Sequence, residues 1–345
     1  MSKLQLLNIM LLKKLTLPEL LSNSCSKFKN NLSLNFVQSG KRTYQDFYNE
    51  VTSIANYLLS SGIRKGDKIA ILSANMPNWG ITQFAIARIG AIAVPVLPGF
   101  SSIEIQNILE HSESKIIFVS KLLYKLVADI KTSYLEQKIL MNTFARIPEE
   151  YPVEAIDKLE NNIGLNNLTP LPAIQVEEED TASIIYTSGT TGFSKGVELT
   201  HRNLVWNARQ CATIQPVSTQ DRFLSILPLA HTYENTLGLL LPVMFGAQIY
   251  YLDRVPTPKL LVPAMQKIRP TVMLSVPLII EKIYKTQVLP KFTSSALMKT
   301  LYNFGPTRKL FNRLAGKKLM QTFGGKIVFF GIGGSKIDPV VSQRG

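Results

Sequence analysis

Short apolar runs alternate with amphipathic helical stretches along most of this sequence, and no other feature restricts its fold as strongly. The runs are continuously apolar, which is typical of strands that are buried on both faces. We predict strands at residues 68–72, 91–97, 115–119, 183–187, 222–227, 248–252, 271–276 and 326–330. Helical patterns separate most of these runs. The alternation therefore predicts an α/β fold of doubly wound, mixed or parallel sheets that helices cover on both faces.

Local signals mark several of the helices between these runs. Thr43 precedes a helical pattern with Asp46 three residues later, a partial capping box, and Gly62 ends that pattern. Further helices are predicted at residues 76–90, 200–212 and 259–268, and both Trp79 and Trp206 are expected to pack. Residues 235–252 carry no charge, but a proline and a glycine interrupt them. We interpret this segment as a buried helix followed by a strand, and not as a membrane span.

The composition indicates a packed protein with an anionic partner. Hydrophobic residues make up 46% of the chain, which excludes a disordered tail. The 38 lysines and arginines outnumber 24 acids, giving a net charge of +14, so nucleic acid, a membrane surface or a phosphate-bearing small molecule is the expected kind of partner. No helix-turn-helix, zinc module or aromatic RNA-binding pattern is present, so we expect no nucleic acid. Two cysteines and three histidines are too few and too scattered for a metal cage.

One segment carries a recognisable chemistry, the run YTSGTTGFSKGVELTHRN at residues 186–203. It follows a predicted strand and precedes a helix whose N-cap is expected at Thr200. Glycines turn the backbone so that its N–H groups point inward, and hydroxyls with an ammonium complete a cradle for phosphate oxygens. The residues expected to form this cradle are Thr187, Ser188, Gly189, Thr190, Thr191, Gly192 and Lys195. We expect the loop to join a central strand to a helix and to be open to solvent; a flexible surface loop is the alternative.

This segment resembles the phosphate-binding signature of the adenylate-forming (AMP-binding) superfamily. A second stretch, LPLAHTYENTLG at 227–238, resembles the substrate motif of its long-chain fatty acid–CoA ligases, and FFGIGGSKIDPVV at 329–341 resembles the glycine-rich turn along the adenine. The resemblance implies that Thr190 touches magnesium, that His231 and Tyr233 line the acyl and adenylate pocket, and that Gly333, Gly334 and Ser335 lie along the adenine. It implies ATP, Mg²⁺, coenzyme A and a long-chain fatty acid as cofactors and substrates.

The sequence departs from this family after the third motif. It ends at Gly345, before the family's tyrosine–glycine–threonine–glutamate motif, ribose aspartate and lid lysine, so no catalytic residue is assigned. We expect a partial AMP-binding domain over residues 1–345, with a first sub-domain region over roughly 1–180, a second over 181–345 that carries the phosphate loop, and no C-terminal lid. The expected activity is an acid–thiol ligase that is impaired alone. The alternative is a non-enzymatic remnant that binds nucleotide or an acyl chain weakly.

Cations concentrate in one part of the chain. Residues 254–326 hold fourteen lysines and arginines and one acid, Glu281. Leu310 and Leu314 follow helical spacing among the cations, so two interpretations stay open: a helix in an anionic membrane interface, and a solvated face whose apolar stripe packs on the core. We expect a cytoplasmic protein, peripheral at the inner face of the membrane in the first case.

Overall fold

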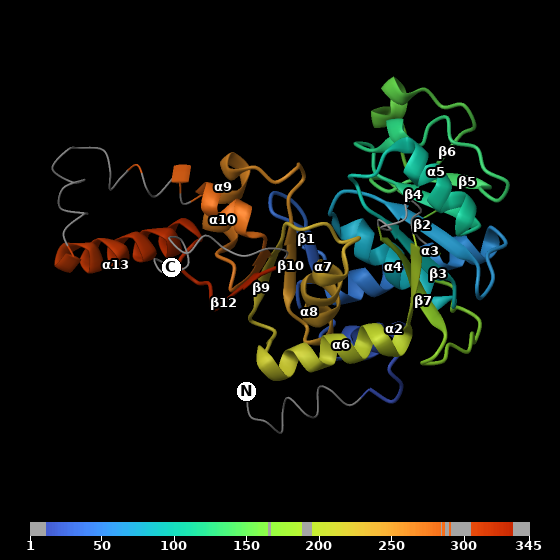
Figure 1. Cartoon of the computed structure of the whole chain (residues 1–345). Helices are drawn as coiled ribbons and strands as arrows, with labels where there is room; N and C mark the ends of the chain where they lie inside the picture. The colour runs from blue at the N-terminus through green and yellow to red at the C-terminus, as the bar shows by residue number, and fades with distance from the viewer. Residues whose placement is uncertain are drawn as a thin grey trace.

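The computed structural model describes residues 12–164, 167–187, 195–283, 285, 286, 290 and 305–333. Two sheets lie side by side with helices between and around them (Figure 1). The seven-stranded sheet has the order β6-β5-β4-β2-β3-β7-β8: Ala145–Ile147, Gln137–Leu140, Ser114–Val119, Lys68–Leu72, Ile92–Val96, Thr181–Thr187 and Lys195–Thr200. The five-stranded sheet has the order β1-β10-β9-β11-β12: Leu34–Phe36, Gln248–Tyr251, Arg222–Ser225, Val272–Ser275 and Phe329–Ile332.

Within these sheets, every pairing is parallel except β5–β6 and β7–β8. The helices are α2 Leu17–Lys27, α3 Tyr44–Ser60, α4 Pro77–Arg88, α5 Ser102–His111, α6 His201–Ile214, α7 Thr232–Glu234, α8 Leu241–Met244, α9 Pro258–Ile268, α10 Pro277–Ile283 and α13 Gly305–Thr322. A π-helical segment, Asn235–Leu240, joins α7 to α8, and short 3₁₀ turns lie at Tyr124–Leu126 and Val153–Lys158. The predicted α/β architecture with covered sheets is confirmed.

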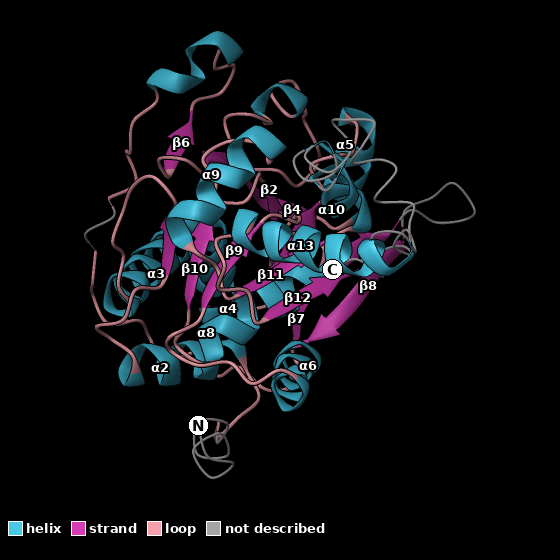
Figure 2. Ribbon diagram, turned by 90° about the vertical axis from the view of Figure 1, so that its left-hand side faces the viewer, coloured by secondary structure: helices cyan, strands magenta, loops and turns pink. Residues whose placement is uncertain are grey.

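In the inner strands of each sheet, alternate residues face different layers, which explains why these strands are mostly apolar on both faces. In β2, Ile69 and Ile71 belong to the core between the two sheets, whereas Ala70 and Leu72 belong to the core under α5. In the other sheet, Phe223 faces the shared core and Leu224 faces the core under α9. The layers are therefore α5, the seven-stranded sheet, a middle helical layer, the five-stranded sheet, and α9 (Figures 1 and 2).

Helix α4 lies in the middle layer and contacts both sheets. Most of its residues are buried, as expected for a helix with apolar surroundings on all sides. Gly80 makes the close approach possible, because a Cβ there would lie 2.6 Å from a methyl carbon of Leu34 in β1. Trp79 is fully buried here, as expected, whereas Trp206 of α6 is 46% exposed with Arg209 over its ring, so that packing prediction is wrong.

Most predicted element bounds are confirmed to within a few residues. The capping box of Thr43 and Asp46 is present, Thr200 caps α6, and residues 235–252 form buried helical turns followed by β10. The last strand is shifted: it begins at Phe329 and not at Lys326, because it pairs with β11 from Val272↔Phe329 onward. Strands β1, β5, β6 and β8 were not predicted.

The two sheets do not follow the expected division of the chain near residue 180. Strands β7 and β8, which lie after that point, complete the sheet of the first region, while β1 near the N-terminus joins the second sheet. Strand β7 is one strand from the sheet's edge, so the expectation of a central strand is wrong. No helix in the described ranges is long and apolar enough to cross a membrane.

Candidate active site

The glycine-rich loop is carried by a hairpin. Strand β7 enters it and β8 leaves it, with Thr187 opposite Lys195 in the last register pair before residues 188–194. Ser188, Gly189, Thr190, Thr191 and Gly192 lie outside the described residues. Thr187 and Lys195 are both exposed, in agreement with the predicted open loop. The return strand β8 was not foreseen: the order is strand, loop, strand and then helix.

A buried tyrosine holds the base of this hairpin. Tyr186, next to Thr187, is 3% exposed, and its hydroxyl lies 2.7 Å from Nδ1 of His111 at the end of α5. Burial raises the pKa of Tyr186, and a hydrogen bond with Ser112 opposes that rise. The ring also lies over Gly196, its register partner on β8, where a Cβ would come 3.3 Å from the ring. The loop is thus anchored from α5 as well as from the sheet.

The second motif supplies a short helical turn beyond the carboxyl end of β9. His231 is exposed and caps α7, because its Nδ1 accepts the backbone N–H of Tyr233 at 3.3 Å. The ring of Tyr233 lies against β12: a Cβ on Gly331 would lie 2.7 Å from its hydroxyl oxygen, and one on Gly333 would lie 3.3 Å from a ring carbon. The structure therefore brings Tyr233 and Gly333 together, whereas Gly334 and Ser335 lie outside the described residues.

Asn75 connects the carboxyl ends of the two sheets. It follows β2, and its Nδ2 donates to Ser225 Oγ at 3.0 Å and to the carbonyl of Leu227, while its Oδ1 accepts the N–H of Leu229 at 3.0 Å. Strands β2, β3 and β7 are parallel, so the glycine-rich loop lies at the same edge as Asn75. Ligands of open parallel sheets bind outside the carboxyl ends of the strands. Thr187, His231, Tyr233 and Gly333 follow or occupy carboxyl ends of this kind, and Lys195 lies at the same edge because it begins the antiparallel strand β8 opposite Thr187.

Glu234 is the residue that the sequence interpretation missed. It is 1% exposed, its Oε1 lies 2.5 Å from Ser225 Oγ, and its Oε2 has no hydrogen-bond partner. Burial raises the pKa of Glu234 to about 8, and the Ser225 hydrogen bond opposes that rise. Since the side chain lies against the π-helical turn at Gly238, it supports the turn directly after Tyr233. The sequence did contain a signal for this residue, because Glu234 is a single acid at the start of an otherwise uncharged segment.

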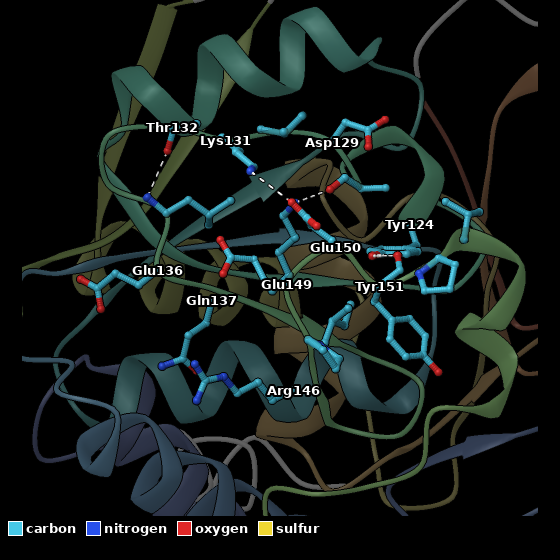
Figure 3. A pocket seen from close by; sticks show the side chains of 18 of the residues that line it. Tyr124, Asp129, Lys131, Thr132, Glu136, Gln137, Arg146, Glu149, Glu150 and Tyr151 are labelled. Carbon is cyan, nitrogen blue, oxygen red and sulfur yellow. Dashed lines mark hydrogen bonds and ion pairs between the residues drawn. The ribbon is translucent and has the colours of Figure 1, made fainter.

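The described residues also contain a cavity of about 960 Å³, but it lies elsewhere (Figure 3). It is lined from the amino end of β5 and the chain after β6, at the opposite edge of the sheet from the glycine-rich loop. Cations and acids are mixed in its wall, for example Lys131 and Glu150, whose side chains lie 3.9 Å apart. None of the predicted site residues lines it. The described ranges contain no group of three or more His, Cys, Asp or Glu side chains that could hold a metal ion.

The family model for AMP-binding enzymes matches residues 21–344, almost the whole sequence. The chain belongs to the AMP-binding enzyme family. Membership implies the use of ATP, and the order of the three motifs agrees with it.

Curated relatives of this AMP-binding chain are acyl-CoA ligases. It is 28% identical over 322 residues to a peroxisomal long chain acyl-CoA synthetase 6 of Arabidopsis thaliana, covering 87% of this chain and 45% of the relative. It is 30% identical over 249 residues to the long-chain-fatty-acid–CoA ligase FadD15 of Mycobacterium bovis, covering 69% and 39%. A crotonobetaine/carnitine–CoA ligase of Citrobacter koseri is 28% identical, covering 85% and 57%. The chain thus spans about half the length of the curated relatives it matches.

Solved structures show the same fold. The N-terminal domain of FACL13 from Mycobacterium tuberculosis superposes with a TM-score of 0.72 at 18% identity, covering 95% of this chain and 72% of that one. VinN superposes with a TM-score of 0.69 at 16% identity, covering 95% and 72%. At such low sequence identities the likeness shows the fold alone. This fold is the α/β arrangement of the N-terminal domain of adenylate-forming enzymes.

Proposed function

We propose that this chain carries the acid-activating part of a long-chain fatty acid–CoA ligase. A carboxylate oxygen of the acid attacks the α-phosphorus of ATP, the bond to the β-phosphate oxygen breaks, and pyrophosphate leaves. In the second half-reaction the thiol of coenzyme A gives up its proton, its sulfur attacks the acyl carbonyl, and AMP leaves. The exposed Lys195 on the glycine-rich hairpin, at the carboxyl edge of the sheet, is the observation on which this proposal depends.

Each candidate residue has a role in this scheme. The Lys195 ammonium, the hydroxyls of Thr187, Ser188, Thr190 and Thr191 and the backbone N–H groups around Gly189 and Gly192 bind phosphate oxygens and orient the triphosphate. His231 and Tyr233 line the acyl and adenylate side, and Gly333, Gly334 and Ser335 lie along the adenine. Thr190 is the protein ligand proposed for Mg²⁺; when bound, this ion neutralises phosphate charge. Such ions keep most of their ligands from phosphate and water, so no cage of carboxylates is required.

The test measures acyl-adenylate and acyl-CoA formation by residues 1–345 from ATP, palmitate and coenzyme A. We expect acyl-adenylate from the unmodified chain, little thioester, and a loss of about 10²- to 10³-fold in Lys195→Ala, the usual cost of removing one charge-stabilising group. Lys125→Ala removes an exposed lysine in the chain after β4, a strand that lies three positions from β7 in the sheet, and serves as the matched control.

ATP binding separates the alternatives. If the folded chain binds ATP but forms no adenylate with any acid, the non-enzymatic alternative holds. If it does not bind ATP, the proposal is wrong.

A further inference from the structure

Positive charge and exposed apolar side chains concentrate in the same part of this protein. Residues 254–326 hold fourteen of the 38 lysines and arginines and one acid. Large apolar side chains in or beside this range are exposed as well, including Leu278 at 71% and Val328 at 74%. The proposed ligase chemistry uses neither feature.

Helix α13 presents both kinds of side chain. Its 18 residues include Arg308, Lys309, Arg313, Lys317 and Lys318 and no acid. Arg313, Leu314, Lys317 and Met320 are exposed. Positions 313, 317 and 320 share one face by helical spacing, and position 314 adjoins it. We call these four residues the basic apolar face.

Among the side chains of α13 that the structure describes, those near its carboxyl end are held by the fold. Leu319 and Phe323 are buried in the core under α9, and the ring of Phe323 stacks on Phe330 of β12 at 5.4 Å. The Gln266 amide donates to the carbonyls of Gln321 and Thr322. The rest of the helix extends away from the five-stranded sheet in Figure 1. In Figure 2, where the molecule is rotated by 90°, the same helix is seen almost end-on.

We propose that the basic apolar face binds the surface of an anionic lipid bilayer. Cations attract the headgroups of such a bilayer, and the apolar side chains between them enter the boundary of the acyl region. A nucleic acid would match the charge, but contacts to its phosphates need no exposed leucine and methionine between the cations. Because α13 is not apolar enough to cross a bilayer, it lies in the interface. This inference is independent of the proposed ligase function.

The experiment measures the binding of residues 1–345 to vesicles of phosphatidylcholine mixed with phosphatidylserine, and to vesicles of phosphatidylcholine alone. We expect binding to the mixed vesicles that weakens as salt is added. Arg313→Gln with Lys317→Gln should weaken it about 30-fold, because each basic contact contributes about 1 kcal/mol. Lys125→Gln with Lys131→Gln removes the same charge from the seven-stranded-sheet region, and this control should change binding by less than about twofold.

A second pair of variants tests the apolar part. Leu314→Ser with Met320→Ser should leave the salt dependence in place and remove the binding that persists at high salt. Equal binding to both kinds of vesicle, no binding by the folded chain, or an equal loss in the control pair would overturn the proposal. So would tight binding to duplex DNA that the serine variants do not weaken, since the face would then recognise a polyanion. Circular dichroism of each variant excludes unfolding as the cause.

Discussion

At the scale of single residues, Glu234 combines an ionisable group with an apolar setting. The Ser225 hydroxyl donates a hydrogen bond to it, and its charge raises the pKa values of Tyr233 and Tyr251; none of these three groups carries a positive charge. A carboxyl group in such a place is more stable with its proton, which is why burial raises its pKa to about 8 from 4.5. The neutral acid can donate or accept a hydrogen bond without the cost of a buried charge.

This environment makes stability depend on pH. The folded state keeps the Glu234 proton between pH 4.5 and about 8 while the unfolded state loses it, so this group's contribution to stability falls as pH rises through that window. Glu234→Gln cannot ionise. We expect its unfolding free energy, relative to the unmodified protein, to increase with pH up to about 8 by at most about 1.4 kcal/mol per pH unit, and then to level off.

Urea unfolding between pH 6.5 and 9 measures this difference. Glu154→Gln changes an exposed carboxylate and is the matched control, with no pH-dependent difference expected. A Glu234→Gln difference that is flat across this range would show that Glu234 is already ionised in the folded protein.

At the scale of elements, the β7–β8 hairpin depends on a glycine. A Cβ at Gly196 would lie 2.9 Å from a methyl carbon of Ile184 and 3.3 Å from the Tyr186 ring. Both neighbours belong to β7, and Tyr186 is fixed by His111, so the ring has little freedom to move. Overpacking of this kind usually costs about 1–3 kcal/mol.

We therefore expect Gly196→Ala to destabilise the protein by about 1–3 kcal/mol in urea unfolding, and to weaken ATP binding because the loop begins and ends on this hairpin. Gly99→Ala is the control, since a Cβ there meets nothing within 4 Å. Unchanged stability in Gly196→Ala would mean that the hairpin moves freely relative to α5.

At the scale of the whole molecule, Asn75 joins the two sheets at the edge where the candidate site lies. One side chain makes three hydrogen bonds, one to Ser225 at the end of β9 and two to the chain that follows this strand. The net contribution of one hydrogen bond to the free energy of unfolding is about 1 kcal/mol, and removing Asn75 also leaves buried polar groups without a partner, which costs more. Asn75→Ala should therefore cost about 2–3 kcal/mol in unfolding free energy.

Two probes report whether the sheets separate. Fluorescence follows Trp79, buried in the middle layer, and exposed Trp206, while far-ultraviolet circular dichroism follows both sheets. We expect the transitions to coincide in the unmodified protein and to diverge in Asn75→Ala. Asn49→Ala removes a surface hydrogen bond on α3 and should leave both unchanged. Coincident transitions with no loss of stability in Asn75→Ala would show that apolar packing alone joins the sheets.

The sequence by itself determined the α/β class, most strands and helices, and the place of the glycine-rich loop. These follow from local physics. Strand β2 is apolar from Ile69 to Leu72 because both of its faces are buried, and helix α3 begins where Thr43 and Asp46 satisfy the first backbone N–H groups. The candidate loop was recognisable because glycines and hydroxyls act through the backbone nearby.

Only the tertiary structure decided what depends on partners far along the chain. Strand β8 is exposed and lacks an apolar pattern, and it is a strand because it pairs with β7. Strand β12 begins at Phe329 because its register on β11 begins there, three residues after the apolar run's first residue. Tyr233 meets Gly333, and Glu234 is buried beside Ser225, because β9, β11 and β12 are parallel neighbours in one sheet, so that the segments after β9 and β12 lie at the same edge. Local patterns report which side chains favour burial, but the pairing of distant segments is set by how the layers fit.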